Sequence, residues 1–251
     1  MEITDKNEKI RINKYMSISG VLSRRRADEA ISNGEILLNG RVAVPGDKVG
    51  PGDEVIYQGK VVKNAGVKKV ILAYNKPLGL VCTSKDADKN SIFRKLDYPE
   101  MLYYVGRLDQ NSQGLLLLTN DGELANQIQK ARNNHEKEYV VRVDKPLTAD
   151  FVSGMRNGVT LEIEDDKNKE KLVRTTKKCA VKQIGRNTFS IILTEGINRQ
   201  IRRMCEHFGY RVVYLKRIRV MNIRLGELAA GEYRELTAEE ERTLRKLCGE
   251  K

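Results

Sequence analysis

The aspartate at position 109 is the side chain whose setting first suggests chemistry. It lies in the polar segment DQNSQG, between two apolar runs, MLYYVGRL and GLLLLTN, that predict strands. A loop held by a rigid sheet is a common place for a reactive carboxylate. An aspartate between two strands is, however, more often a turn former. The pattern alone makes Asp109 a candidate catalytic carboxylate.

A strongly basic segment from Arg199 to Arg219 is the second candidate, with seven basic residues against one acid, Glu206. Apolar residues recur in its first half at helical spacing and are expected to face a core: Ile201, Met204, Cys205 and Phe208. On such a helix Arg202 could hold a carboxylate in place, while Arg199 and Arg203 meet phosphates. A plain basic amphipathic helix explains the pattern equally well.

Tyr139 is the third candidate. It opens a strand-like run in the segment HEKEYVVRV, and its ring could stack on an extruded base. A tyrosine that simply covers a sheet surface is the commoner case.

The elements that must position these side chains form the larger part of the chain. Strand-like runs alternate with few helical stretches, of which DGELANQI and NRQIRRMCEHFG are the clearest. The inventory predicts a mixed α/β sheet with helices packed on it, in the α+β class. Thr237 to Glu240 has the spacing of a capping box and predicts a short last helix.

A smaller module is predicted before it. Ser23 can cap a helix that contains Ala27, Ala30 and Ile31 on one face, and Asn39-Gly40 predicts a tight hairpin between two β-rich runs. Residues 61–69 have turn formers and cations with little periodicity, which indicates a linker.

Arg24, Arg25 and Arg26 open the second predicted helix. Three cations in a first turn oppose the helix dipole, so phosphate contacts explain them better than a merely solvated turn does. The order of helices, hairpin and turns resembles the small S4-like RNA-binding module found in a ribosomal protein and several modification enzymes. It implies binding to structured RNA.

Composition narrows the class of protein. The chain has 251 residues, 40% of them hydrophobic, and a net charge of +12, which favours a polyanionic partner such as nucleic acid. With a mean hydropathy of −0.52 and no apolar run of spanning length, no membrane segment is expected. The charged N-terminal segment MEITDKNEKI lacks the core of a secretory signal, so we expect a cytoplasmic protein.

The cysteines and histidines argue against metal or disulfide chemistry. Four scattered cysteines and two histidines form no CxxC pair or other zinc-ligand spacing. We therefore expect no metal and no disulfide.

Taken together, the segments NKPLGLVCTS, VGRLDQNSQGLLLLTNDGEL, HEKEYVVRV, GINRQIRRMCEHFGY and LAAGEYRELT resemble the RsuA/RluB/RluE/RluF family of ribosomal RNA pseudouridine synthases, with HEKEY and the GINRQIRRM segment nearest the RluF branch. The likeness extends over about residues 9–237. It implies a catalytic domain with a mainly antiparallel sheet over residues 69–251, preceded by an S4-like domain over residues 9–66.

The resemblance also implies a role for each matching residue. Asp109 would be the catalytic nucleophile, and Tyr139 would stack on the target uracil and help to remove the proton from its carbon 5. Arg202 would pair with the Asp109 carboxylate, and Arg107 would occupy the space left by the flipped nucleotide. Because the reaction is an isomerisation, it requires no redox cofactor, nucleotide or metal.

The expected function is site-specific isomerisation of uridine in 23S ribosomal RNA by a monomer. Two alternatives stay open: a synthase for small-subunit (16S) rRNA or for tRNA, and a non-catalytic RNA-binding factor for ribosome assembly. The intact trio of Asp109, Tyr139 and Arg202 favours the enzyme, because phosphate binding alone has no use for a central carboxylate.

Overall fold

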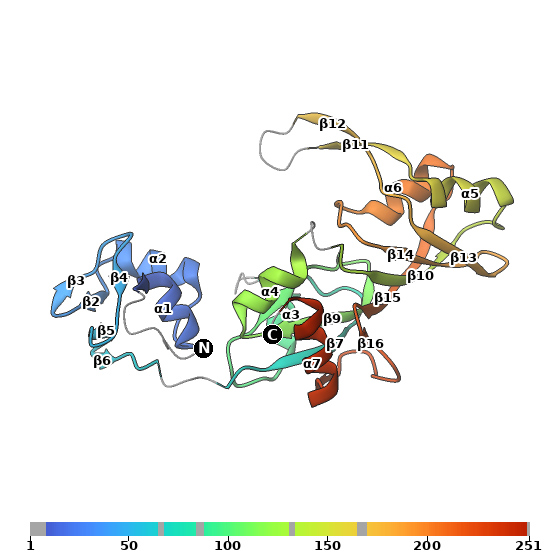
Figure 1. The fold of residues 1–251 in the computed structure, drawn as a ribbon. Helices are drawn as coiled ribbons and strands as arrows, with labels where there is room; N and C mark the ends of the chain where they lie inside the picture. The colour runs from blue at the N-terminus through green and yellow to red at the C-terminus, as the bar shows by residue number, and fades with distance from the viewer. Residues whose placement is uncertain (1–8, 65–67, 84–87, 131–133, 165–169, 250–251) are drawn as a thin grey trace. The chain divides into compact units, whose positions relative to one another are not determined.

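A computed structural model describes residues 9–64, 68–83, 88–130, 134–164 and 170–249 (Figure 1). Its contacts divide the chain into two compact units. The first unit holds the residues up to Val70 with two short segments, Tyr98–Tyr103 and Thr119–Gly122, and the second holds the rest. The two domain boundaries expected from the sequence stay predictions. The end of the predicted N-terminal domain, at residue 66, and the last two residues of the chain lie outside the described ranges.

The first unit is a small α+β domain. Helices α1 (Ile12–Ile18) and α2 (Arg24–Ser32) pack beside a four-stranded antiparallel sheet with strand order β3-β2-β5-β6. These strands are β2 (Ile36–Leu38), β3 (Arg41–Val42), β5 (Val55–Tyr57) and β6 (Lys60–Val61), and a separate pair joins β1 (Ile10–Arg11) to β4 (Lys48–Val49).

Local sequence signals account for this domain. The Ser23 side chain accepts a hydrogen bond from the amide of Arg26, which confirms the predicted helix cap. Asn39 and Gly40 both have positive φ between paired Leu38 and Arg41, as a type I′ turn requires.

The predicted linker over residues 61–69 is wrong in its first part. Val61 ends strand β6, and Val62 is buried in the core of the domain, with its amide donating to the carbonyl of Val55. The lysines around these residues concealed Val62, whose apolar surface the small domain buries, whereas Val61 is exposed. Residues 65–67 lie outside the described ranges.

A nine-stranded sheet forms the centre of the second unit. Its main strand order is β13-β14-β10-β15-β9-β7-β17, with β16 paired to β15 and β8 paired to β9. The strands are β7 (Ile71–Lys76), β8 (Tyr103–Val105), β9 (Gln113–Thr119), β10 (Lys137–Val143), β13 (Ala180–Gly185), β14 (Thr188–Leu193), β15 (Val212–Val220), β16 (Ile223–Arg224) and β17 (Tyr233–Glu235). Most of the strand pairs are antiparallel, and β15 with β9 is parallel. This confirms the predicted α+β class.

Helices cover this sheet in two groups (Figure 1). Helices α5 (Ala149–Asn157) and α6 (Gln200–His207) bury Phe151 and Met204 in one apolar cluster with β10, β14 and β15. Helices α4 (Gly122–Gln129) and α7 (Ala238–Leu247) contribute to a second cluster with β7 and β9. The remaining elements are the short helix α3 (Ile92–Lys95) and a separate hairpin of β11 (Thr160–Glu164) and β12 (Lys171–Thr175).

The predicted capping box is confirmed at α7, where Thr237 and Glu240 exchange both hydrogen bonds. Helix α5 was missed, although Thr148 caps it and Phe151 and Met155 are buried one turn apart. Among the described residues, no helix is long and apolar enough to cross a membrane.

Candidate active site

A cleft of about 580 Å³ in the second unit brings together five of the residues selected from the sequence. Asp109 and Arg107 come from the loop between β8 and β9, and Tyr139 comes from β10. Arg202 comes from α6, and Arg199 immediately precedes that helix. Segments far apart in the sequence therefore meet around one carboxylate.

The loop that carries Asp109 is fixed from two sides. Within the loop, the amide of Ser112 donates to the Asp109 carbonyl over 3.0 Å. From the end of β7, Lys76 donates to the Ser112 carbonyl over 2.7 Å, and the Gly79 amide donates to the carbonyl of Gln110 over 2.9 Å. The half-buried Asp109 side chain is thus presented by a backbone that has little freedom to move.

Arg202 holds the same loop from helix α6. Its guanidinium is largely buried and donates to the carbonyl of Asn111 over 2.7 Å and to Ser112 Oγ over 3.3 Å. Burial lowers the pKa of Arg202, the Arg199 charge lowers it further, and the Asp109 charge opposes both. Among the described residues no ion pair joins Arg202 to Asp109. Its hydrogen bonds go to the Asn111 carbonyl and Ser112 hydroxyl that follow the aspartate, and to the carbonyl of Val212 on β15.

The turn before α6 is braced by buried polar groups. The Gln200 side chain accepts from the Ile197 amide over 3.1 Å and donates to the buried Glu195 carboxylate over 2.9 Å. Arg199 has a left-handed backbone conformation, with φ of 53°, at the start of the helix. This conformation leaves its exposed side chain at the cleft while Arg202, three residues on, points inward.

Tyr139 lies on the cleft face of the sheet. Its register partners are Ile191 on β14 and Arg217 on β15. The tyrosine is half-buried and lines the same cleft as Asp109, so a flat ring is available beside the carboxylate.

Comparison with known proteins decides what kind of site this is. The sequence profile described as RNA pseudouridylate synthase matches residues 70–207, and that of the S4 domain matches residues 10–55. The chain belongs to the family of RNA pseudouridylate synthases. Its second unit is accordingly the catalytic part of a pseudouridine synthase, and its first contains an S4 domain.

Individual relatives agree with this assignment. The dual-specificity RNA pseudouridine synthase RluF of Escherichia coli K12 is 45% identical over 92% of this chain and 77% of its own length. The ribosomal large subunit pseudouridine synthase B of Bacillus subtilis is 34% identical over 95% of this chain and 96% of its own. A crystal structure described as a pseudouridylate synthase superposes with a TM-score of 0.66 at 27% identity, covering 95% of this chain and 99% of that one.

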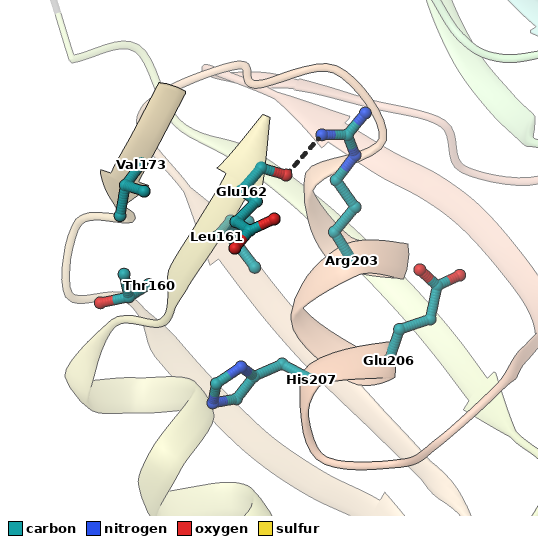
Figure 2. Close-up of a pocket in the computed structure, with 7 residues that line it drawn as sticks. All are labelled: Thr160, Leu161, Glu162, Val173, Arg203, Glu206 and His207. Carbon is teal, nitrogen blue, oxygen red and sulfur yellow. Dashed lines mark hydrogen bonds between the residues drawn. The ribbon is translucent and has the colours of Figure 1, made fainter. Parts of the chain in front are cut away.

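Arg203 of the synthase does not line the cleft around Asp109. It lines a separate hollow of about 670 Å³ between α6 and the β11–β12 hairpin, together with His207 and Glu162 (Figure 2). Its guanidinium donates to the carbonyl of Glu162 over 3.2 Å. The two arginines Arg202 and Arg203 therefore diverge, because neighbouring residues on a helix point in different directions.

The arginine triplet of the synthase lies on the other unit. Arg24, Arg25 and Arg26 form the first turn of α2, and all three side chains are exposed. They are on the surface of the S4 domain, and their contact with RNA phosphates stays a prediction.

Three basic residues at the cleft escaped the sequence analysis. Arg217 and Lys137 line the cleft, and Lys76 is fully buried under the Asp109 loop. The run YLKRIRV was considered only as a stretch of positive charge, whereas in the synthase it is the central strand β15. Apolar Leu215, two residues earlier on the same strand, was the signal that could have placed Arg217 on an inward face, since alternate residues of a strand share a face.

Proposed function

We propose that this synthase isomerises a specific uridine of 23S ribosomal RNA, with Asp109 as the nucleophile and the target base flipped into the cleft. The observation that carries the proposal is the meeting of Asp109, Tyr139 and Arg202 in one cleft of a pseudouridine synthase. The large-subunit synthase of B. subtilis supports ribosomal RNA as the substrate class, and the dual specificity in the name of the E. coli relative keeps a second RNA, such as tRNA or 16S rRNA, as an alternative.

The chemistry needs a nucleophile and no outside reactant. The bond between uracil N1 and the sugar C1′ breaks, and a bond between C5 and C1′ forms. A proton leaves C5 and one is gained at N1, so the atoms balance within the nucleotide. A carboxylate can assist by bonding covalently either to C1′ or to the uracil ring.

In this proposal Arg202 acts mainly as a positioning residue. It holds the carbonyl of Asn111 and the hydroxyl of Ser112, which follow Asp109 in the loop. Its positive charge favours the ionised form of a nearby carboxylate, and a fixed charge in a cleft that excludes water costs little reorganisation during the reaction.

Tyr139 would stack on the uracil and take part in removing the C5 proton. A base that leaves its helix loses stacking and pairing at a cost of a few kcal/mol, which an aromatic side chain partly restores. We assign Arg107, which is exposed at the cleft, to the space that the flipped nucleotide leaves.

The remaining cations would bind phosphate. Arg199 is exposed at the cleft, Arg203 is half-buried in the separate hollow, and Arg24 to Arg26 are exposed on the S4 domain. We propose that these contacts select structured RNA and offset the cost of extruding the base.

The proposal is tested by mapping pseudouridines, through carbodiimide adducts and primer extension, in unmodified 23S rRNA, 16S rRNA and tRNA incubated with the protein. A new stop in 23S rRNA is expected. A stop only in 16S rRNA or tRNA would overturn the substrate assignment and keep the activity. No stop in any of the three RNAs, nor in ribosomal particles purified from cells that lack the protein, would contradict the proposal as a whole.

A further inference from the structure

Arg217 has a buried donor group that the protein leaves unsatisfied. Its side chain is only 2% exposed, yet it lines the cleft that contains Asp109. Its Nε donates to the carbonyl of Leu115 on β9 over 2.6 Å. Its Nη2 is buried and has no hydrogen-bond partner among the described residues.

The sheet places this guanidinium between the other two functional elements of the cleft. On one side Arg217 is the register partner of Tyr139 on β10, and on the other side it is the partner of Gly114 on β9. Side chains directly opposite each other in neighbouring strands point to the same face, so Arg217 lies beside Tyr139. Strand β9 begins four residues after Asp109, which puts Arg217 between the aromatic ring and the loop of the nucleophile.

The backbone at this point is packed for close approach. Gly114 has a φ of +105°, and a Cβ atom there would collide with the carbonyl oxygen of Arg217. Only glycine lets β9 and β15 come together at this position. The position of Arg217 is therefore set by the fold and does not depend on a bound molecule.

The electrostatic surroundings favour an acceptor at Nη2. Lys137 is on the same strand as Tyr139, lines the cleft and has its pKa lowered to about 8, first by burial and then by the charge of Arg217. Lys76, also buried, lies close enough for the Arg217 charge to affect its pKa. A buried cation with an unsatisfied N–H group costs free energy, and an oxygen of a bound molecule would remove that cost.

A base fits this donor better than a phosphate does. Phosphates of the bound RNA stay in the RNA backbone, where exposed cations such as Arg107 and Arg199 can bind them. A donor that is 98% buried can be reached only by a group that enters the cleft, and the flat edge of uracil carries two carbonyl oxygens, O2 and O4.

We propose that Nη2 of Arg217 donates a hydrogen bond to a carbonyl oxygen of the target uracil and so orients the ring over Asp109. The inference rests on the proposed function, because it requires the base to enter the cleft. When uracil turns over about its N3–C6 axis, N1 exchanges places with C5 and O2 exchanges places with O4. A single fixed donor can therefore hold one carbonyl oxygen before the glycosidic bond breaks and the other when the new carbon–carbon bond forms.

The test combines a protein variant with altered substrates. A short RNA containing the mapped uridine is synthesised with uridine, 2-thiouridine or 4-thiouridine at that position, and single-turnover rate constants are measured for wild type and Arg217→Lys. Sulfur accepts hydrogen bonds poorly, so each thio substitution should slow the wild type about tenfold. Arg217→Lys should be about 100-fold slower on uridine, and no slower still on the thio substrates.

Arg219→Lys is the matched control. Arg219 lies two residues along the same strand, and its guanidinium is bound by Glu136 and Glu138. This variant should keep the wild-type sensitivity to sulfur.

Two results would overturn the proposal. One is a thio effect in Arg217→Lys as large as in the wild type, which would leave Arg217 a purely structural role through Leu115. The other is a wild-type enzyme indifferent to both thio substitutions, a result that holds even if the variant fails to fold. If the wild type forms no pseudouridine in any RNA or ribosomal particle, no uridine can be mapped, and the proposed function fails together with this inference.

Discussion

The buried arginines of the cleft and the exposed arginines of helix α2 show the same type of side chain in two different environments. Arg202 and Arg217 are buried, and their guanidinium groups are held by backbone carbonyls of the sheet and of the Asp109 loop. Arg24 to Arg26 are exposed on the first turn of a helix in the other unit. Cations of the first kind contribute through fixed geometry in a medium of low dielectric constant, whereas those of the second contribute through long-range attraction that salt screens.

The contrast teaches that charge count alone does not locate the chemistry. The basic segment from Arg199 to Arg219 looks uniform in sequence. In the structure, Arg199 is exposed at the cleft and Arg202 is buried against the Asp109 loop. Arg203 lines the separate hollow (Figure 2), and Arg217 is buried on strand β15. Burial and hydrogen-bond partners, rather than sign, distinguish their roles.

The substitution Arg202→Lys tests most directly whether a buried arginine of the cleft acts on the rate of reaction rather than on RNA affinity. Lysine keeps the charge but cannot reproduce the planar guanidinium, whose Nη2 reaches Asn111 and Ser112 while Nη1 reaches the carbonyl of Val212. The single-turnover rate constant should fall about 100-fold, while the Kd for RNA changes less than about threefold. Arg156→Lys is the control. Arg156 lies on α5 away from the cleft and donates to the carbonyl of Val181, and its replacement should leave both values unchanged. A large loss of RNA affinity with an unchanged single-turnover rate constant would contradict this account and would show that Arg202, like the α2 arginines, acts in RNA binding.

The exposed side is tested by replacing Arg24, Arg25 and Arg26 together with glutamine. RNA affinity should fall about 10- to 100-fold at moderate salt, and the slope of log K against log salt should decrease by about two to three. At saturating RNA the single-turnover rate constant should stay within about twofold of wild type. A control with glutamine at Lys48, Lys60 and Lys63, three exposed lysines of the same unit, separates the specific effect from a general loss of charge. Equal losses in both triple variants would contradict a specific role of α2.

The smallest effect expected is a dependence on pH through Lys137. Because burial lowers the pKa of Lys137 to about 8, its positive charge is present below that pH and is lost as the pH rises through it. The single-turnover rate constant should decline several-fold between pH 7 and pH 9 as the cleft loses a cation. Lys137→Arg, which stays charged, should remove this decline, and Lys137→Met should be slow and flat across the range. A decline of the same size in Lys137→Arg would assign the titration to another group.

Much of the molecule could be predicted from local sequence signals. The Asn39-Gly40 turn, the Ser23 cap and the box from Thr237 to Glu240 are short-range devices whose geometry depends on a few adjacent residues, and all three are present. The motif around Asp109 was equally local. The α+β class followed from the inventory of strands and helices.

The failures have a common physical cause. Val62 belongs to a core although Lys60 and Lys63 flank the pair of valines, and Arg217 is buried although arginine is usually exposed. Val62 is held by its contact with the Val55 strand, which the lysines around it concealed. Arg217 is buried by its contact with the Leu115 carbonyl, which overrides the preference of its residue type. The contact of Arg217 joins residues 102 positions apart and leaves no periodicity in one sequence.

Arg202 illustrates an intermediate case. The sequence placed it near the carboxylate, and the cleft brings both residues together. Its hydrogen bonds are made to the loop after Asp109 and to the carbonyl of Val212, which no pattern of residue types could specify. The exact partners of a buried arginine depend on how the backbone closes around it.

The most direct measurement of the central claim is single-turnover pseudouridine formation by Asp109→Asn on an RNA that the wild type modifies. Asparagine keeps the shape of the side chain and removes the nucleophilic carboxylate, so product formation should fall at least about 10⁴-fold while the Kd for RNA stays within about threefold. Asp150→Asn, the same change at an exposed position on α5, should behave as wild type. An Asp109→Asn protein that still forms pseudouridine at a rate near wild type would contradict the account.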